Sequence, residues 1–405
     1  MPEVSVPSGT NFNFEMAFPS NSNYQLAQQL ANALLVPSQN GTETFSLYTL
    51  NSQAIPTVPG GHVGALAAVE SVTPLSIPVT VPSGYSFTAI ETYNFTPLQG
   101  NGVPGNGGAN ETTLISSISG VEFDTGGGSG TVVAGGGNNL IGSPTAGGGA
   151  YLFVGGSGND TFTASSGNDT VSPGAGSNLV ELGTGNDSVS LSGTNDTVLA
   201  GSGSDTITVN GHDAALVDGG SGKLTFINGS APSTVIGGTG SETIQGGAGG
   251  GMFKGGSGGN NAITGGAGKA TMFGGGSGDT LAAGGHAGDT LIAASGNETL
   301  TSAASAGLDS MYGGSGSDAM IAGAGGDQML GGSGATDFQF VKGLTNAASS
   351  YDVYNYHAGD TVTLSGYTGA PTISAAGGNT VLGLSDGTKI TFVGVSSGSN
   401  LNIDT

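Results

Sequence analysis

Acidic residues recur at a fixed spacing in the middle of the chain. Between residues 155 and 208, six segments of nine residues follow one another without insertion. The sixth position of each segment is aspartate in five cases and asparagine in one. These residues are Asp160, Asp169, Asn178, Asp187, Asp196 and Asp205. Carboxylates repeated at one place in a regular unit could supply the oxygen ligands that hard divalent cations prefer.

Two other positions of these units are equally regular. The fourth is glycine in five units, Gly158, Gly167, Gly176, Gly185 and Gly203, and Thr194 in the remaining one. The eighth is always large and apolar, namely Phe162, Val171, Val180, Val189, Val198 and Ile207. A glycine turn followed by a brief strand with one inward side chain predicts stacked coils. The fold class that we expect is all-β, a parallel β-roll or β-solenoid.

The block resembles the RTX (repeats-in-toxin) nonapeptide, GGxGxDxUx, in which U is large and apolar. The resemblance implies several Ca²⁺ ions, each held between stacked turns by aspartates and by backbone carbonyls of the glycine loops. The implied metal ligands in this block are Asp160, Asp169, Asp187, Asp196 and Asp205, with the turns at Gly158, Gly167, Gly185 and Gly203. The alternative is that these residues form polar turns without an ion.

In the RTX roll, successive units alternate between two sheets, so every second turn is stacked. Applied to this chain, the resemblance stacks Asp169, Asp187 and Asp205 on one edge. The other edge stacks Asp160 and Asp196 around the uncharged Asn178. We therefore expect tighter cation sites on the edge that keeps every carboxylate.

A second acid-bearing block covers residues 274–337, with less regular spacing. Its predicted metal ligands are Asp289, Asp309, Asp318 and Asp327. Asp309 should stack with Asp327, and Asp318 should stack near Asp337, which is shifted by one place. Residues 209–273 keep the glycines and the apolar positions, but Glu242 alone stands where the aspartate would be. We expect the solenoid to continue there with little calcium.

The composition narrows the range of partners. The 405 residues carry a formal net charge of −23, with five lysines and no arginine. Nucleic acid and anionic membrane surfaces are therefore poor partners. The chain has no cysteine and no apolar run long enough for a membrane span. Its first residues, MPEVSVPSG, lack the basic and apolar regions of a secretory signal peptide.

We expect three parts. Residues 1–123 should form a β-rich domain with one helix at 22–35, where Leu26, Leu30 and Leu34 share a face. Residues 124–340 should form the solenoid. Residues 341–405 should form a cap and export segment, because the stretch from Asp352 to Leu364 resembles the region that follows RTX repeats in proteins of bacterial type I secretion. That resemblance implies an uncleaved C-terminal signal and a secreted, extracellular or cell-surface protein.

No catalytic motif stands out. The sequence has no H-E-x-x-H and no cysteine nucleophile, and its four histidines are far apart. We expect a non-enzymatic, calcium-stabilised structural protein that forms a homo-oligomer or polymer, as a fibre, surface layer or biofilm matrix. One alternative is a calcium-dependent adhesin that binds a cell surface or polysaccharide through residues 1–123. A third is a glycan-active enzyme.

Overall fold

The computed structural model describes the backbone of nine strands before residue 125 and most of the chain after it. The described residues are 3–7, 13–17, 43–50, 63–70, 79–80, 85–92, 96–99, 111–117, 120–124, 129–142, 149–285, 288–346 and 349–405. They fall into two compact units, Met1–Thr206 and Ile207–Thr405. The helix expected at 22–35 lies outside the described residues.

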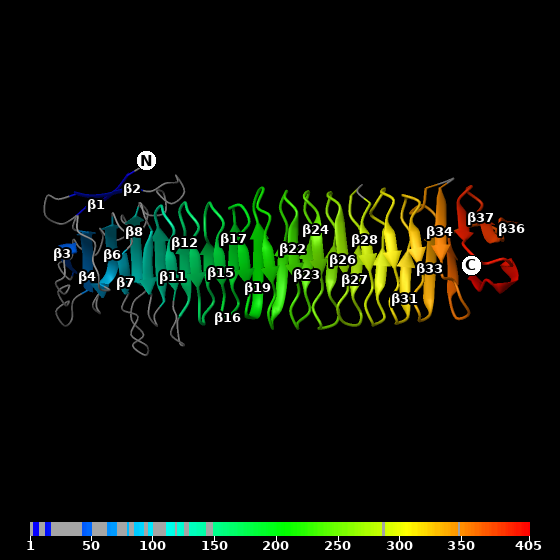
Figure 1. Ribbon diagram of the computed structural model, residues 1–405, viewed down its shortest axis with the longest axis horizontal. Coiled ribbons are helices and arrows are strands. Elements are labelled where there is room, and N and C mark those ends of the chain that lie inside the picture. Colours follow the sequence, from blue (N-terminus) through cyan, green and yellow to red (C-terminus); the bar gives the residue numbers. More distant parts are fainter. Residues whose placement is uncertain are drawn as a thin grey trace. The chain divides into compact units, whose positions relative to one another are not determined.

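The first unit is built from parallel ladders of short strands (Figure 1). One ladder holds β3 (Glu43–Leu50), β4 (Val63–Glu70), β6 (Tyr85–Thr92), β8 (Glu111–Ser117), β10 (Gly130–Ala134), β12 (Tyr151–Val154), β14 (Thr170–Ser172) and β17 (Ser188–Leu191). The other holds β5 (Val79–Thr80), β7 (Thr96–Gln99), β9 (Val121–Asp124), β11 (Leu140–Gly142), β13 (Thr161–Thr163), β15 (Leu179–Glu181) and β18 (Thr197–Leu199). Successive strands alternate between the ladders, which makes each pair one coil of a parallel β-solenoid.

Smaller elements complete this unit. β1 (Glu3–Pro7) and β2 (Asn13–Ala17) pair antiparallel with each other. β16 (Thr184–Gly185) pairs in parallel with the first residues of β19 (Ser202–Val209), the strand that contains the boundary between the units. The strands of residues 43–124 thus belong to the same parallel ladders as the acidic repeats. The division of the chain at residues 123 and 340 stays a prediction.

The second unit repeats this architecture. One ladder runs through β21 (Lys223–Ile227), β23 (Thr243–Gln245), β25 (Ala262–Thr264), β27 (Thr280–Ala282), β29 (Thr299–Thr301), β31 (Asp318–Ile321), β33 (Thr336–Val341), β35 (Thr361–Ser365) and β39 (Ile403–Asp404). The other runs through β20 (Leu216–Asp218), β22 (Ser233–Ile236), β24 (Gly251–Lys254), β26 (Ala270–Phe273), β28 (Thr290–Ile292), β30 (Ser310–Tyr312), β32 (Gln328–Leu330), β34 (Ser350–Tyr354) and β38 (Lys389–Phe392). The all-β solenoid prediction is confirmed, including its continuation through 209–273.

The C-terminal end of the second unit departs from the parallel pattern. β36 (Thr372–Ala376) and β37 (Asn379–Gly383) form an antiparallel hairpin, and β37 pairs antiparallel with β38. A single 3₁₀ turn, η1 (Gly398–Asn400), follows. Within the described ranges, no helix is long and apolar enough to cross a membrane.

Most three-residue strands of the described coils bury one apolar side chain, at the middle position of the strand. Val171, Val180 and Val189 are buried in the first unit, as the eighth position of the repeat predicts. Larger side chains are buried in both units, such as Phe162 in the first and Phe226 and Phe253 in the second. Because one such side chain gives a coil little core of its own, burial depends on neighbouring coils.

Glycines at the turns allow backbones of successive coils to touch. Gly250 has φ +67°, and a Cβ placed on it would lie 2.0 Å from the carbonyl oxygen of Lys269. Gly211 has a similar φ of +85°, but a Cβ there would meet nothing within 4 Å. A side chain at Gly211 would therefore meet only backbone strain, whereas a side chain at Gly250 would also collide with the next coil.

We predict that Gly250→Ala destabilises the second unit more than Gly211→Ala. The Gly211 variant should cost about 1–2 kcal/mol, because only the left-handed backbone is penalised. The Gly250 variant adds a collision with the next coil. Urea unfolding of both variants in saturating calcium measures the difference, and equal losses would contradict the proposed tight stacking.

Candidate metal site: columns of carboxylates at the turns

The first acid column, formed by Asp169, Asp187 and Asp205, links successive coils of the first unit. Each carboxylate accepts a hydrogen bond from a backbone N–H one coil earlier. Tyr151 N–H donates to Asp169 Oδ1 over 2.7 Å, Asp169 N–H to Asp187 Oδ1 over 2.7 Å, and Asp187 N–H to Asp205 Oδ1 over 3.0 Å. The structure therefore stacks these three residues, as the resemblance to the RTX repeat implies.

The second acid column lies at the other set of turns in the first unit and consists of Asn139, Asp160, Asn178 and Asp196. Backbone N–H groups again donate to the Oδ1 atom of the next member, over 2.7–2.8 Å. The Nδ2 amides of Asn139 and Asn178 also donate to Oδ1 of Asp160 and Asp196, over 2.8 and 2.9 Å. In this column, asparagine amides thus add a second hydrogen bond to Oδ1 of the neighbouring carboxylates, whereas Oδ2 of Asp160 is buried without a hydrogen-bond partner among the described residues.

Sequence reasoning missed Asn139. Its segment, GGGNNLIG, has glycines followed by a short apolar stretch but contains no acidic residue. Asn139 occupies the place of the acid, and Leu140 and Ile141 follow it as the strand begins. An asparagine between a glycine turn and an apolar strand was the available signal.

Burial makes the carboxylates of the first unit costly to ionise. Asp160, Asp169 and Asp205 are each at most 3% exposed. This burial raises their pKa from 3.8 to about 6. The charge of Asp187 further raises the pKa of Asp169 and of Asp205, as expected for like charges placed together. A column of such groups is stabilised by protons or by a bound cation.

The second carboxylate oxygens show where a cation would act. Oδ2 of Asp187 and of Asp205 is buried and has no hydrogen-bond partner among the described residues. A buried carboxylate oxygen without a partner is strongly unfavourable unless it is protonated or coordinates a metal. The first acid column therefore fits a hard, oxygen-seeking cation.

The remaining ligands would come from the backbone. In the described ranges, no three histidine, cysteine, aspartate or glutamate side chains converge on one point. At the predicted turns, a Cβ on Gly158, Gly185 or Gly203 would lie 1.4–2.2 Å from a stacked carbonyl oxygen. Gly167 likewise lies against the backbone of Gly149. Carbonyl-rich turns beside carboxylates suit calcium, which takes six to eight oxygen ligands in loose geometry.

In the second unit, most of the carboxylates at the corresponding turn positions form an additional hydrogen bond. Their second oxygen accepts the backbone N–H of a residue in their own turn. The pairs are Asp279 with Gly275 at 2.7 Å, Asp289 with Gly284 at 2.9 Å, Asp318 with Gly314 at 2.9 Å, and Asp327 with Gly323 at 3.0 Å. Two glutamates also accept turn amides: Glu242 from Gly238 and Glu298 from Ala294, although Oε1 of Glu298 is buried without a partner in the described part of the chain. A cation in this unit would compete with turn amides for these oxygens.

Asp309 is the exception among the predicted ligands of the second unit. Its N–H donates to Asp327 Oδ1 over 3.1 Å, which confirms that these two residues stack. Its Oδ1 accepts from Asp289 N–H over 2.6 Å. Its Oδ2 is buried and forms no hydrogen bond within the described part of the chain. In having a buried Oδ2 without a hydrogen bond among the described residues, Asp309 is like Asp187 and Asp205 of the first acid column and unlike Asp318 and Asp327.

Asp337 is shifted by one place from the residue that pairs with Asp318, as expected from the sequence. Asp318 pairs with Thr336, and Asp337 pairs with Ala319. Thr336 N–H then donates to Asp360 Oδ1 over 2.9 Å, so Asp360 continues the column. Asp337 instead accepts from the hydroxyl of Thr363 over 2.7 Å. The inward register of Phe338 fixes which neighbour faces the turn, because a shift of one residue reverses every side chain.

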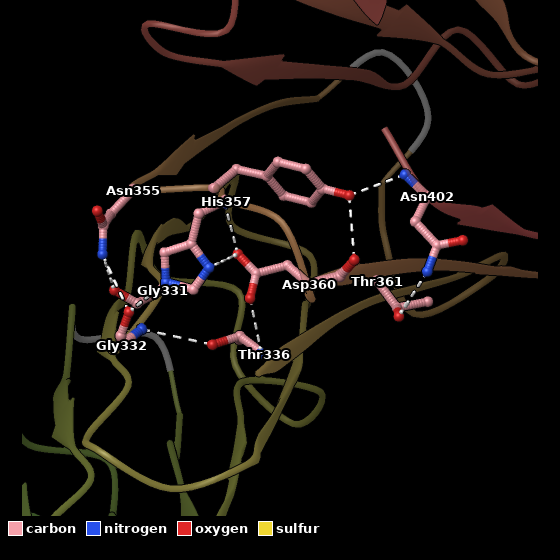
Figure 2. Close-up of polar contacts among 9 residues, drawn as sticks. Gly331, Gly332, Thr336, Asn355, His357, Asp360, Thr361 and Asn402 are labelled. Atoms are coloured by element: carbon pink, nitrogen blue, oxygen red, sulfur yellow. Dashed lines mark hydrogen bonds and ion pairs between the residues drawn. The ribbon is translucent and has the colours of Figure 1, made fainter. Parts of the chain in front are cut away.

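Asp360 ends this column in a network of polar contacts (Figure 2). Its Oδ2 accepts the N–H of His357 over 2.8 Å and lies 3.4 Å from His357 Nδ1. The other ring nitrogen of His357 is 3.0 Å from Gly332 O. Asn355 Nδ2 donates to the same carbonyl and to that of Gly331. The last acid of the column is thus held by its own loop.

These features define a class of protein: a parallel β-solenoid whose turns present stacked acidic residues. Four segments of the chain match the RTX calcium-binding nonapeptide repeat, at residues 145–180, 174–207, 255–286 and 304–336. Four RTX calcium-binding nonapeptide repeats are thus found in the chain, and repeats of this kind bind several Ca²⁺ ions. No curated protein sequence matches the chain. The individual metal ligands named from the sequence stay predictions.

In the absence of calcium, we predict that protonation of the buried carboxylates at low pH stabilises the fold in place of the cation. A carboxyl whose folded pKa is raised contributes stability that is complete below its unfolded pKa and is lost as pH rises through the folded value. For Asp160, Asp169 and Asp205 the loss should fall between about pH 4 and pH 6. Far-UV circular dichroism in EGTA should show more β-structure at pH 3.5 than at pH 7.5. An unchanged spectrum would contradict the burial of unpaired carboxylates.

We also predict that the two units respond differently to loss of one charge. Asp187→Asn should raise the calcium concentration at the folding midpoint by roughly tenfold, because calcium affinity follows the number of charged ligands. Asp318→Asn is the matched control. It loses one hydrogen bond, worth about 1 kcal/mol, and should change the midpoint little. Calcium titrations followed by circular dichroism compare them, and equal shifts would refute the distinction.

Proposed function

We propose that this protein is a secreted structural protein whose solenoid is completed by calcium outside the cell. The observation that carries the proposal is the first acid column, with buried carboxylates of raised pKa and second oxygens of Asp187 and Asp205 that lack a partner among the described residues. Binding of Ca²⁺ would neutralise the column, so the free energy of binding would become free energy of folding.

Export fits the same chemistry. Free calcium inside a cell is too low for sites of the affinity typical of extracellular modules, with Kd about 10⁻⁴–10⁻³ M. Repulsion among ionised carboxylates in a chain of net charge −23 would then keep the repeats unfolded and able to be threaded through a transporter. RTX-repeat proteins are typically secreted by bacteria. The resemblance of residues 341–405 to type I export segments agrees with that route.

Assembly into a fibre, surface layer or biofilm matrix is the role that we infer for the folded protein. Large apolar side chains are exposed along the coils, among them Leu216 at 46%, Met252 at 43% and Leu308 at 57%. Such side chains would favour contact between copies once calcium has neutralised part of the charge. That the protein is not an enzyme stays a prediction.

A calcium-dependent adhesin is the second candidate. On the outer side of the ladder from β26 to β34, paired residues form the column Phe273, Ile292, Tyr312, Leu330 and Tyr354. Aromatic residues occupy every second coil, about 10 Å apart. A parallel column of Thr271, Thr290, Ser310 and Gln328 accompanies it. Rings flanked by hydroxyl and amide groups would suit a neutral polysaccharide.

Electron microscopy with and without calcium tests the assembly. Ordered polymers should appear when calcium is added at neutral pH and should disappear after EGTA. Addition of magnesium at the same concentration is the control, because Mg²⁺ requires near-ideal octahedral geometry that loose carbonyl turns do not provide. Monomers that stay separate in calcium yet sediment with polysaccharide would overturn assembly and favour the adhesin.

A further inference from the structure

The hairpin at the C-terminal end of the second unit carries an unpaired strand edge. β36 pairs with β37 on one side, and among the described residues its remaining neighbour is η1, whose Gly398 lies beside the side chain of Ile373. All five residues of β36 are exposed, and Ile373 remains 52% exposed. Figure 1 shows β36 and β37 at the end of this unit, after β34. Such an edge offers N–H and C=O groups to any extended strand.

The turn geometry identifies which backbone groups face outward. The loop between the strands is Gly377–Gly378, with φ of +59° and +85°, and Ala376 pairs with Asn379 across it. In a two-residue hairpin the pair that flanks the loop is hydrogen-bonded, and bonded and non-bonded pairs then alternate. Ala376, Ser374 and Thr372 therefore bond β37. Ile373 and Ala375 direct their N–H and C=O groups away from it.

Apart from Pro371 at its start, β36 lacks the charges and the bulge that often protect a strand edge. Strand edges are commonly blocked by lysine, by a bulge or by an inward-pointing charge. No charged residue occurs between Asp360 and Asp386, in a chain of net charge −23. The pairing of β36 with β37 also shows no register shift. This charge-free hairpin is a place where a second acidic copy can approach without facing like charges in the paired strand.

Proline limits the register. Pro371 would provide the next outward-facing amide before Ile373, but proline has no N–H. The usable edge is thus centred on Ser374, between Ile373 and Ala375. When two copies of this edge run antiparallel, Ile373 of each can exchange N–H···O=C bonds with Ala375 of the other. Ser374 then faces Ser374 as a non-hydrogen-bonded pair.

We propose that β36 is a docking strand for a second copy of this chain, joined antiparallel about Ser374. The contact has two-fold symmetry and therefore joins two copies only. A larger assembly would need at least one other contact in addition. This inference rests on the proposed assembly and adds to it the partner, a second copy, and the strand that binds it. The small area of five-residue strands makes the pair weak in dilute solution, so covalent capture is the suitable readout.

The absence of cysteine from the sequence makes the test specific. In the proposed pair, Cα atoms of the two Ser374 residues lie about 4.5 Å apart, within the roughly 4.4–6.8 Å that a disulfide spans. The full chain with Ser374→Cys, oxidised in calcium, should therefore form a disulfide-linked dimer. Ala376→Cys alone should not, because its two copies lie about 13 Å apart. An equal mixture of Ala376→Cys and Thr372→Cys should crosslink again, because these residues face each other.

A further variant separates pairing from chance collision. Ala375→Pro removes an outward N–H without removing a bond to β37, so the fold should persist by circular dichroism. Combined with Ser374→Cys, it should reduce the crosslinked fraction at least fivefold. Equal crosslinking of Ser374→Cys and Ala376→Cys, or no crosslinking of either, would overturn the inference. Calcium-dependent polymers without the Ser374 crosslink would support the proposed function and contradict the docking strand. Crosslinked pairs without polymers would support the docking strand and contradict the proposed assembly.

Discussion

The hydrogen bond from a backbone N–H to a carboxylate in the next coil is the interaction on which this solenoid depends. It fixes the height of one turn above another, as between Asp169 and Asp187. It also draws each carboxylate into the stack, where Asp187 and Asp205 are only 2% and 1% exposed. The bond that orders the coils therefore creates a buried line of like charges. This negative charge must be neutralised by a proton or a cation, or stabilised by additional hydrogen bonds.

The chain meets this constraint in three ways. In the first acid column the second oxygens of Asp187 and Asp205 have no partner within the described residues, which leaves them for a cation. In the second acid column, amides such as that of Asn178 add a hydrogen bond to Oδ1 of the adjacent carboxylate, although Oδ2 of Asp160 has no partner among the described residues. In the second unit, turn amides such as that of Gly314 bond the second oxygen of most carboxylates. The repeats thus share one fold while differing in the hydrogen bonds that their carboxylates receive.

The sequence period predicted the solenoid, and the resemblance to the RTX repeat implied the stacking of Asp169, Asp187 and Asp205 and that of Asp309 on Asp327. The one-place shift of Asp337 was also visible in the sequence. The sequence did not reveal that Asp360 continues the column after Thr336, because a longer loop separates these two residues. It also could not reveal that Gly314 N–H reaches Asp318, because both kinds of turn use glycine and aspartate. Those differences arise from backbone geometry, which residue type alone does not encode.

Amide hydrogen exchange with and without calcium at neutral pH tests this account most directly. Exchange of Asp169 and Asp187 N–H reports the first acid column, and exchange of Asn261 and Asp309 N–H reports the second unit. Removal of calcium should abolish protection at Asp169 and Asp187 while Asn261 keeps measurable protection. Full protection of Asp169 and Asp187 after exhaustive chelation would contradict the claim that a cation neutralises their column.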